Sequence, residues 1–196
     1  MAKLRSPIKR LRAFVKDEYG VASIEAILLM PLLMWAYVAT YVVYDGYKRQ
    51  LDGLRSTYAV ADAISREEQA LNQFYLDSMI ELTDFMTHSP SGITQRVTIV
   101  CYDEDDEEYF VAWSRTTGPR EASYPVHNDS SVNNNADRLP DFPEGDQVIL
   151  VETFMEYTPL MNIGLDDQLF EYWIFTRPRF TNQIKWQGQN SWTCTG

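Results

Sequence analysis

Gly20, Val21 and Glu25 have the types and spacing for an ion pair between neighbouring helices. Cutting the chain after Gly20 would give Val21 a free α-ammonium group and make Glu25 the fifth residue. Glu25 is the only charged side chain from Val21 to Tyr44, and an acid costs about 2.5–3.5 kcal/mol at the middle of a membrane. A cation within hydrogen-bond reach offsets such a carboxylate. We therefore expect the ammonium of one subunit to meet Glu25 of its neighbour, so that the acid sets the register of an assembly.

Two other interpretations of Glu25 remain open. The side chain can lie near the cytoplasmic interface and reach lipid headgroups, where the cost of an acid is smaller. One helical turn separates Val21 from Glu25, so the two can also pair within one chain.

Cys101 and Cys194 are the two cysteines of the chain. In an exported domain an even number of cysteines predicts a disulfide. The bridge would close a loop of about 90 residues, contribute roughly 4–5 kcal/mol in the chain-entropy model, and pin the tail Lys185–Gly196 to the domain. Two free thiols, or pairing with another subunit, are the alternatives.

Other side chains that could do chemistry indicate no enzyme. His88 and His127 are the only histidines and both lie beside loop signals, so no histidine-rich metal site is expected. The acidic run Asp103–Glu108 lacks the glycine and spacing of an EF-hand and is typical of a solvated hairpin tip. We expect no catalytic residues, no cofactor and no metal.

The segment that positions Glu25 is long enough to cross a membrane. Val21–Tyr44 comprises 24 residues, and a helix of that length spans about 36 Å, against a hydrocarbon core of about 30 Å. Residues 1–20 carry six basic and two acidic side chains, which keeps this end in the cytoplasm and exports residues 45–196. A secretory signal peptide would have a shorter apolar core and a cleavage site after it.

The same stretch resembles a known family. The pattern is carried by Phe14, Asp17, Glu18, Gly20, Ile24, Glu25, Ala26, Leu28, Pro31, Leu32 and Leu33. It is similar to the N-terminus of TadE/TadF-like pseudopilins, minor components of the tight-adherence (Flp, type IVb) pilus machinery of bacteria. Segments Thr57–Glu68 and Phe175–Phe180 favour the TadF type over the TadE type. The resemblance implies cleavage after Gly20 by an inner-membrane prepilin peptidase, and incorporation of the mature helix into or beneath a pilus.

Pro31 belongs to that pattern. A proline inside a helix removes one backbone hydrogen bond and usually bends the helix. A simple kink is one interpretation. The other is a soft point that helps the helix leave the lipid and enter a filament, which would give Pro31, like Glu25, a part in subunit assembly.

Two helices are expected after the span. The first continues the apolar helix with one apolar face, formed by Tyr47, Leu51, Leu54, Tyr58 and Ala61. Ser65 and Glu68 fit a capping box, which predicts a break near Ile64 and a second helix from about Arg66 to Thr87. Its apolar stripe is expected to pack on a sheet, and consists of Leu71, Phe74, Tyr75, Met79, Leu82, Phe85 and Met86.

The remainder of the chain is typical of strands. Residues 95–102, 108–114, 147–159 and 167–180 are rich in β-branched and aromatic side chains, and Pro178 should mark the end of the fourth strand or an edge. Helices followed by strands predict an α+β fold with an antiparallel sheet, similar to the pilin plan. Residues 115–146 show no periodicity and are expected to form a mobile exported insertion; a surface loop that meets a partner pilin is the alternative.

Two functions follow as expectations. The first is a minor pseudopilin with a basic leader (1–20), a transmembrane helix (21–44) and a periplasmic domain (45–196). It would support initiation or assembly of a Flp-type pilus. Its partners would be the prepilin peptidase, other pilins or pseudopilins and the inner membrane of a bacterium, with no nucleic acid. The second is an uncut, single-span scaffold or sensor in the periplasm.

Overall fold

A computed structural model describes residues 21–104, 107–140, 142–161, 163–189 and 194. The chain divides into two units, Met1–Tyr44 and Asp45–Gly196. Helix α2 (Val21–Ser65) belongs to both units, since it passes through Tyr44 and Asp45 without interruption. The predicted cleavage residue Gly20 and the basic leader lie outside the described residues.

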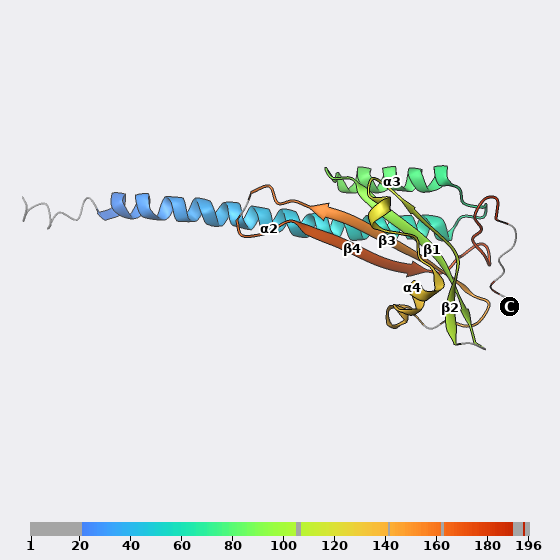
Figure 1. Ribbon diagram of the computed structural model, residues 1–196. Coiled ribbons are helices and arrows are strands. Elements are labelled where there is room, and N and C mark those ends of the chain that lie inside the picture. Colours follow the sequence, from blue (N-terminus) through green and yellow to red (C-terminus); the bar gives the residue numbers. More distant parts are fainter. Residues whose placement is uncertain (1–20, 105–106, 141, 162, 190–193, 195–196) are drawn as a thin grey trace, which may run out of the picture. The chain divides into compact units, whose positions relative to one another are not determined.

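The second unit contains a four-stranded antiparallel sheet in the order β2-β1-β3-β4 (Figure 1). Its strands are β1 (Ile93–Asp103), β2 (Glu108–Thr117), β3 (Gln147–Tyr157) and β4 (Gln168–Thr176). All four predicted strands exist, and Pro178 follows the end of β4, which is an edge strand. Two helices followed by this sheet confirm the predicted α+β fold.

Helix α2 covers the sheet with a face of small side chains. Within the second unit most of its buried residues recur at the spacing of one helical face. The buried residues are Gly53, Ser56, Thr57, Val60, Ala61, Ile64 and, at the helix end, Ser65. The predicted continuation of the helix is confirmed. The predicted apolar face is not the face that packs on the sheet, because Tyr47, Leu51 and Tyr58 are exposed. Small residues allow the helix to lie close to the sheet, where the Tyr172 ring occupies the space beside Gly53.

Helix α3 (Gln73–Thr87) begins seven residues later than predicted. Ser65 is the last residue of α2, and its hydroxyl donates to the Asp62 carbonyl instead of capping a new helix. The chain then leaves the helix through a turn at Arg66, and Leu71 forms a bridge with Trp186. The N-cap of α3 is Asn72, whose side chain accepts from the Tyr75 N–H at 2.9 Å.

The apolar stripe of α3 is only partly in the core. Leu76, Thr83 and Thr87 are buried, whereas Phe74 and Phe85 are 79% and 74% exposed. The prediction that the whole stripe packs on the sheet is therefore wrong. Threonines replace the apolar residues on the buried face, where the Gln95 amide donates to the Thr83 hydroxyl at 2.9 Å.

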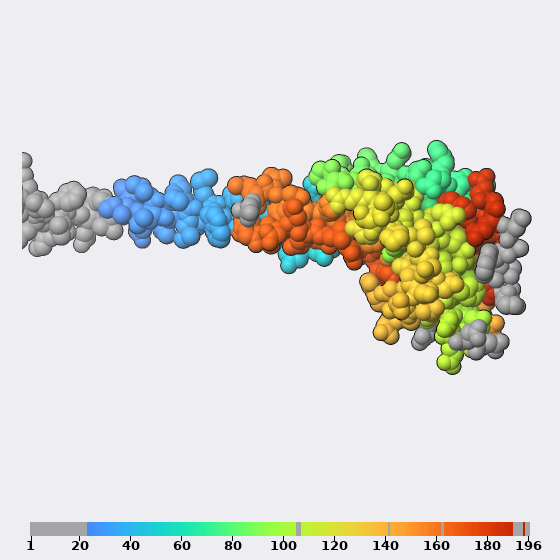
Figure 2. Space-filling model, viewed as in Figure 1, coloured from blue at the N-terminus to red at the C-terminus, as the bar shows by residue number. Residues whose placement is uncertain are grey.

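The opposite face of the sheet is covered by the connection between β2 and β3. This connection contains three short helices: η2 (Glu121–Ser123), α4 (Asp129–Asn133) and η3 (Ala136–Arg138). Val132, Leu139 and Phe142 pack with Val100 and Val148 of the sheet. The first residues of the 115–146 segment extend β2, and the described residues after them form the outer layer, coloured yellow and orange in Figure 2. The segment therefore contains more regular structure than predicted, while its mobility stays a prediction.

Candidate assembly site in the apolar helix

The first unit presents an apolar helix with almost no burial of its own. Every side chain from Ser23 to Tyr37 is exposed, including Ile27 and Leu28 at 71% and 70%. An exposed apolar surface of this extent marks a site that meets lipid or another protein. The helix is long and apolar enough to cross a membrane, consistent with a single-pass anchor.

Glu25 is the one charged group on this surface. Its side chain is exposed, and within the described chain it has no ion-pair partner. Residues three, four and seven positions later share its side of a helix, so that Leu28, Leu29 and Leu32 surround the carboxylate with apolar surface. A second helix that packs here would contact one carboxylate among leucines. A single polar group of this kind can fix the alignment of the two helices along their axes.

Pro31 lies inside α2, which continues through it. Because proline has no N–H, the carbonyl of Ile27 lacks its usual donor four residues later. Glu25 and Ile27 therefore place two acceptors, a carboxylate and a backbone carbonyl, within one turn of the same apolar helix. Both would be satisfied by donors from outside the helix, such as an ammonium group or a lipid headgroup.

Cys101 and Cys194 form a disulfide with their Cα atoms 5.6 Å apart. Cys101 lies near the end of β1, and both cysteines are buried. The predicted pairing within the chain is therefore present. Two further bonds hold the tail beside it, because Trp113 Nε1 donates to the Ile184 carbonyl at 3.0 Å and the Ile184 N–H donates to Gln147 Oε1 at 2.8 Å.

A buried polar cluster, which we call the Glu152 cluster, was missed from the sequence. It consists of Arg96, His127, Ser131 and Glu152. Arg96 donates to both carboxylate oxygens of Glu152 at 2.7 and 2.5 Å, and His127 Nε2 lies 2.9 Å from Glu152 Oε2. The other ring nitrogen of His127 lies 2.8 Å from Ser131 Oγ. The position of Glu152 inside the apolar strand 147–157 could have indicated this cluster, because a buried acid needs a partner.

The electrostatics of the Glu152 cluster favour the ionised acid. Burial alone would raise the pKa of Glu152, but hydrogen bonds from Arg96 and His127 bring that pKa below its ordinary value. Ser131, His127 and Glu152 lie in a row, as in a hydrolase triad. The Ser131 Oγ atom, however, is also bonded to the Asn128 backbone in a capping box. Arg96 further donates to the Pro125 carbonyl at 2.6 Å. The cluster therefore fastens the connection between β2 and β3 to the sheet.

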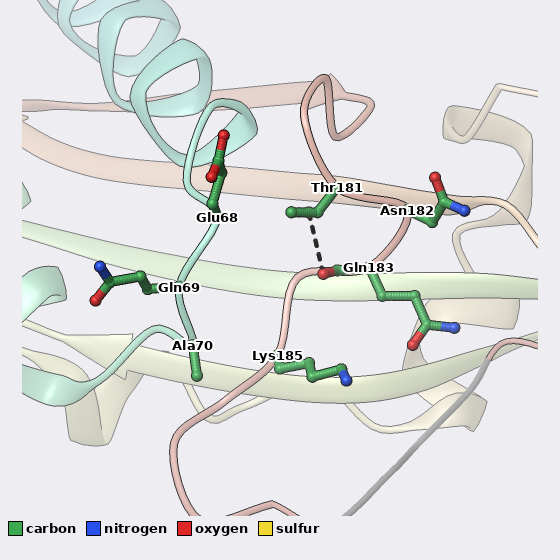
Figure 3. A pocket seen from close by; sticks show the side chains of 7 residues that line it. All are labelled: Glu68, Gln69, Ala70, Thr181, Asn182, Gln183 and Lys185. Carbon is green, nitrogen blue, oxygen red and sulfur yellow. Dashed lines mark hydrogen bonds between the residues drawn. The ribbon is translucent and has the colours of Figure 1, made fainter.

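One open hollow of about 480 Å³ lies where α2 ends and the C-terminal tail passes (Figure 3). It is lined by Glu68, Gln69, Ala70, Thr181, Asn182, Gln183 and Lys185. The lining is polar, and the Thr181 hydroxyl is bonded within the wall to the Gln183 carbonyl at 3.1 Å. Glu68 and Gln69 are exposed, so the hollow has no buried charge that would select a ligand.

Comparisons of the chain with protein-family models, with curated proteins and with solved structures find no match. The resemblance to pseudopilins stays a prediction from the sequence around Gly20 and Glu25.

Proposed function

We propose that this chain is a minor pseudopilin of a tight-adherence (Flp, type IVb) pilus, of the TadF type. In this proposal a prepilin peptidase cuts it after Gly20. The observation that carries the proposal is one exposed acid, Glu25, on an apolar helix of membrane length, five residues after a glycine that a basic leader precedes.

The proposed chemistry is an ion pair formed on assembly. Cleavage turns the Val21 amide into an ammonium group, which is the donor that Glu25 lacks within the described chain. In lipid, two such groups on separate helices are each costly, and their pairing removes most of that cost. The pair therefore favours helix association in one register, with other pilins or pseudopilins of the system as partners.

The location follows from the same segment. The basic leader stays in the cytoplasm, the span lies in the bacterial inner membrane, and residues 45–196 enter the periplasm. The disulfide between Cys101 and Cys194 supports an oxidising compartment for this domain. Part of the protein would then be carried into, or lie beneath, the pilus.

Two variants test the proposal. Gly20→Ala should block processing, so that the protein in cells keeps its leader and pili are not assembled. Glu25→Ala should leave processing intact and still impair assembly, because the new ammonium loses its partner. Intact mass of the membrane protein and electron microscopy of pili give the two readouts.

Matched controls are available in the second unit. Gly46→Ala makes the same change in α2 where an added methyl group would meet the Tyr157 ring at 3.5 Å, an ordinary contact. Glu81→Ala removes an exposed carboxylate of α3. Both should process and assemble normally. Normal pili in Glu25→Ala cells would refute the ion pair, and an uncut wild-type chain in piliated cells would favour the scaffold.

A further inference from the structure

The sheet has two edges, and the β2 edge is closed by side chains. Asn133 accepts from the Tyr109 N–H at 2.8 Å and donates to the Tyr109 carbonyl at 2.7 Å. Asp129 accepts from the Val111 N–H at 2.7 Å, and Gln189 donates to the Ala112 carbonyl at 3.1 Å. These groups take the place of a neighbouring strand along the first half of β2.

The β4 edge is left open. Within the described chain no side chain or loop bonds to the outer backbone of Gln168–Thr176. The strand has nine residues, no proline or glycine, and one charge, Glu171. Short length, charges, proline and bulges are the usual means of blocking an edge, and β4 has at most one of them.

Apolar side chains flank the β4 edge on both faces of the sheet. On the outer face Leu169 and Phe175 are 43% and 42% exposed. On the helix face, Arg49 of α2 points toward α3 and bonds to the Thr87 and His88 carbonyls. Leu54 of α2 packs beside Tyr172 and Phe170 of the β4 strand. The exposed Leu51 and Tyr58 lie three residues before and four residues after Leu54, on the same flank of the helix.

The geometry argues against antiparallel pairing of β4 with a second copy of this chain. Tyr172 of β4 bonds to Gln50, and Arg179 beyond β4 bonds to Ser65, so β4 and α2 run in the same direction. Antiparallel pairing of two β4 strands would set the two α2 helices in opposite directions, which conflicts with anchoring in one membrane. Pairing of β4 with β2 of a copy in the same orientation is hindered, because side chains already bond to the outer backbone of β2.

We propose that β4 receives an added strand from a different protein. The backbone of that segment would supply the hydrogen bonds that the open edge lacks, as in β-strand addition. Its side chains would be apolar on both faces, to cover Leu169 and Phe175 on one side and Leu51 and Tyr58 on the other. A lysine or arginine opposite Glu171 would complete a cross-strand charge pair.

A peptide of the same length as β4 provides the probe. It alternates valine and leucine, so that both faces are apolar, carries one central lysine, and is added at millimolar concentration to the full-length chain in detergent. Hydrogen exchange of the β4 amides, followed by mass spectrometry, should slow by about tenfold or more. The same peptide with alternate amides N-methylated cannot donate its backbone bonds and should give no protection.

A charge exchange tests the specificity. Glu171→Lys should abolish protection by the lysine peptide, and a peptide with a central glutamate should restore it. Glu81→Lys makes the same change on an exposed position of α3 and should leave protection by the lysine peptide unchanged. Equal protection by the methylated peptide, or none by any peptide, would overturn the proposal.

Cross-linking in cells identifies the occupant. Benzoylphenylalanine in place of Phe175 should join this chain to a strand of one other protein on illumination, whereas the same group in place of Phe85 on α3 should not give that adduct. An adduct between two copies of this chain would overturn the choice of a different protein. The peptide experiment involves no pilus, so its outcome is independent of the proposed function.

Discussion

Two glutamates, Glu152 and Glu25, differ in whether the described chain supplies a cation for the carboxylate. Glu152 is 3% exposed and is bonded to Arg96 and His127 of the same chain. Glu25 lies on an exposed apolar helix and has no ion-pair partner within the described chain. An acid that already has its cation stabilises its own fold. An acid that lacks one is available to a neighbouring subunit, and this difference is the basis of the proposed role of Glu25.

The residue-scale prediction concerns Glu152→Gln. The change leaves the buried guanidinium of Arg96 without its carboxylate, so the free energy of unfolding at neutral pH should fall by about 3 kcal/mol. Urea denaturation measures the loss. Glu81→Gln, an exposed site on α3, is the matched control and should change the free energy of unfolding by less than about 0.5 kcal/mol.

The effect of Glu152→Gln should depend on pH. Folding lowers the pKa of Glu152, so its ionised form stabilises the fold at all pH values above the ordinary pKa of a glutamate. That contribution disappears as the pH falls from the ordinary value through the lowered one. The difference between wild type and Glu152→Gln should therefore shrink on acidification over this range. A difference that stays constant or grows would contradict the role of ionised Glu152.

At the scale of the element, contact between α2 and the sheet depends on the absence of a side chain at Gly53. A methyl group there would lie 2.5–2.7 Å from atoms of the Tyr172 ring. The ring is buried, and its hydroxyl donates to the Gln50 carbonyl at 2.9 Å, so it cannot move without losing that bond. Burial and the nearby Asp52 raise the pKa of Tyr172, which keeps the donor protonated.

Gly53→Ala is therefore expected to destabilise the domain by about 1–3 kcal/mol through overpacking. Helix propensity alone favours alanine by about 1 kcal/mol, so the two effects have opposite signs. Gly46→Ala, with its ordinary contact, should be neutral or stabilising. Thermal unfolding of both variants gives the comparison, and a Gly53→Ala variant as stable as Gly46→Ala would show that the ring relocates freely.

The sequence predicted where the strands lie better than it predicted which side chains of each helix are buried. All four strands were found because β-branched and aromatic residues fill them, and Cys101 and Cys194 were paired correctly. The faces of the helices that pack on the sheet were not predicted. The spacing of apolar residues in α2 pointed to Tyr47 and Leu51, whereas close contact between α2 and the sheet requires glycine, serine and threonine. Loop-like composition likewise concealed the layer formed by residues 118–140 and Phe142, in which Val132 and Phe142 pack on one face of the sheet.

At the scale of the whole molecule, the charges and cross-link fit a protein divided by a membrane. Residues 1–20 are basic, whereas the 176 residues after them carry 26 acidic and 11 basic side chains. The disulfide joins positions 93 residues apart, which constrains the unfolded chain more than a short loop would. In the described chain the exposed apolar helix and the β4 edge are separate surfaces. We propose that the first meets lipid or other helices and that the second receives an extended segment.

The most direct test of the proposed function is the identity of the first residue of the native protein. The protein would be isolated from membranes of piliated cells, and its N-terminus would be determined by Edman sequencing together with intact mass. A chain that begins at Val21 with a free ammonium group is the predicted result. A chain that still begins at or near Met1, in cells with normal pili, would contradict the proposal.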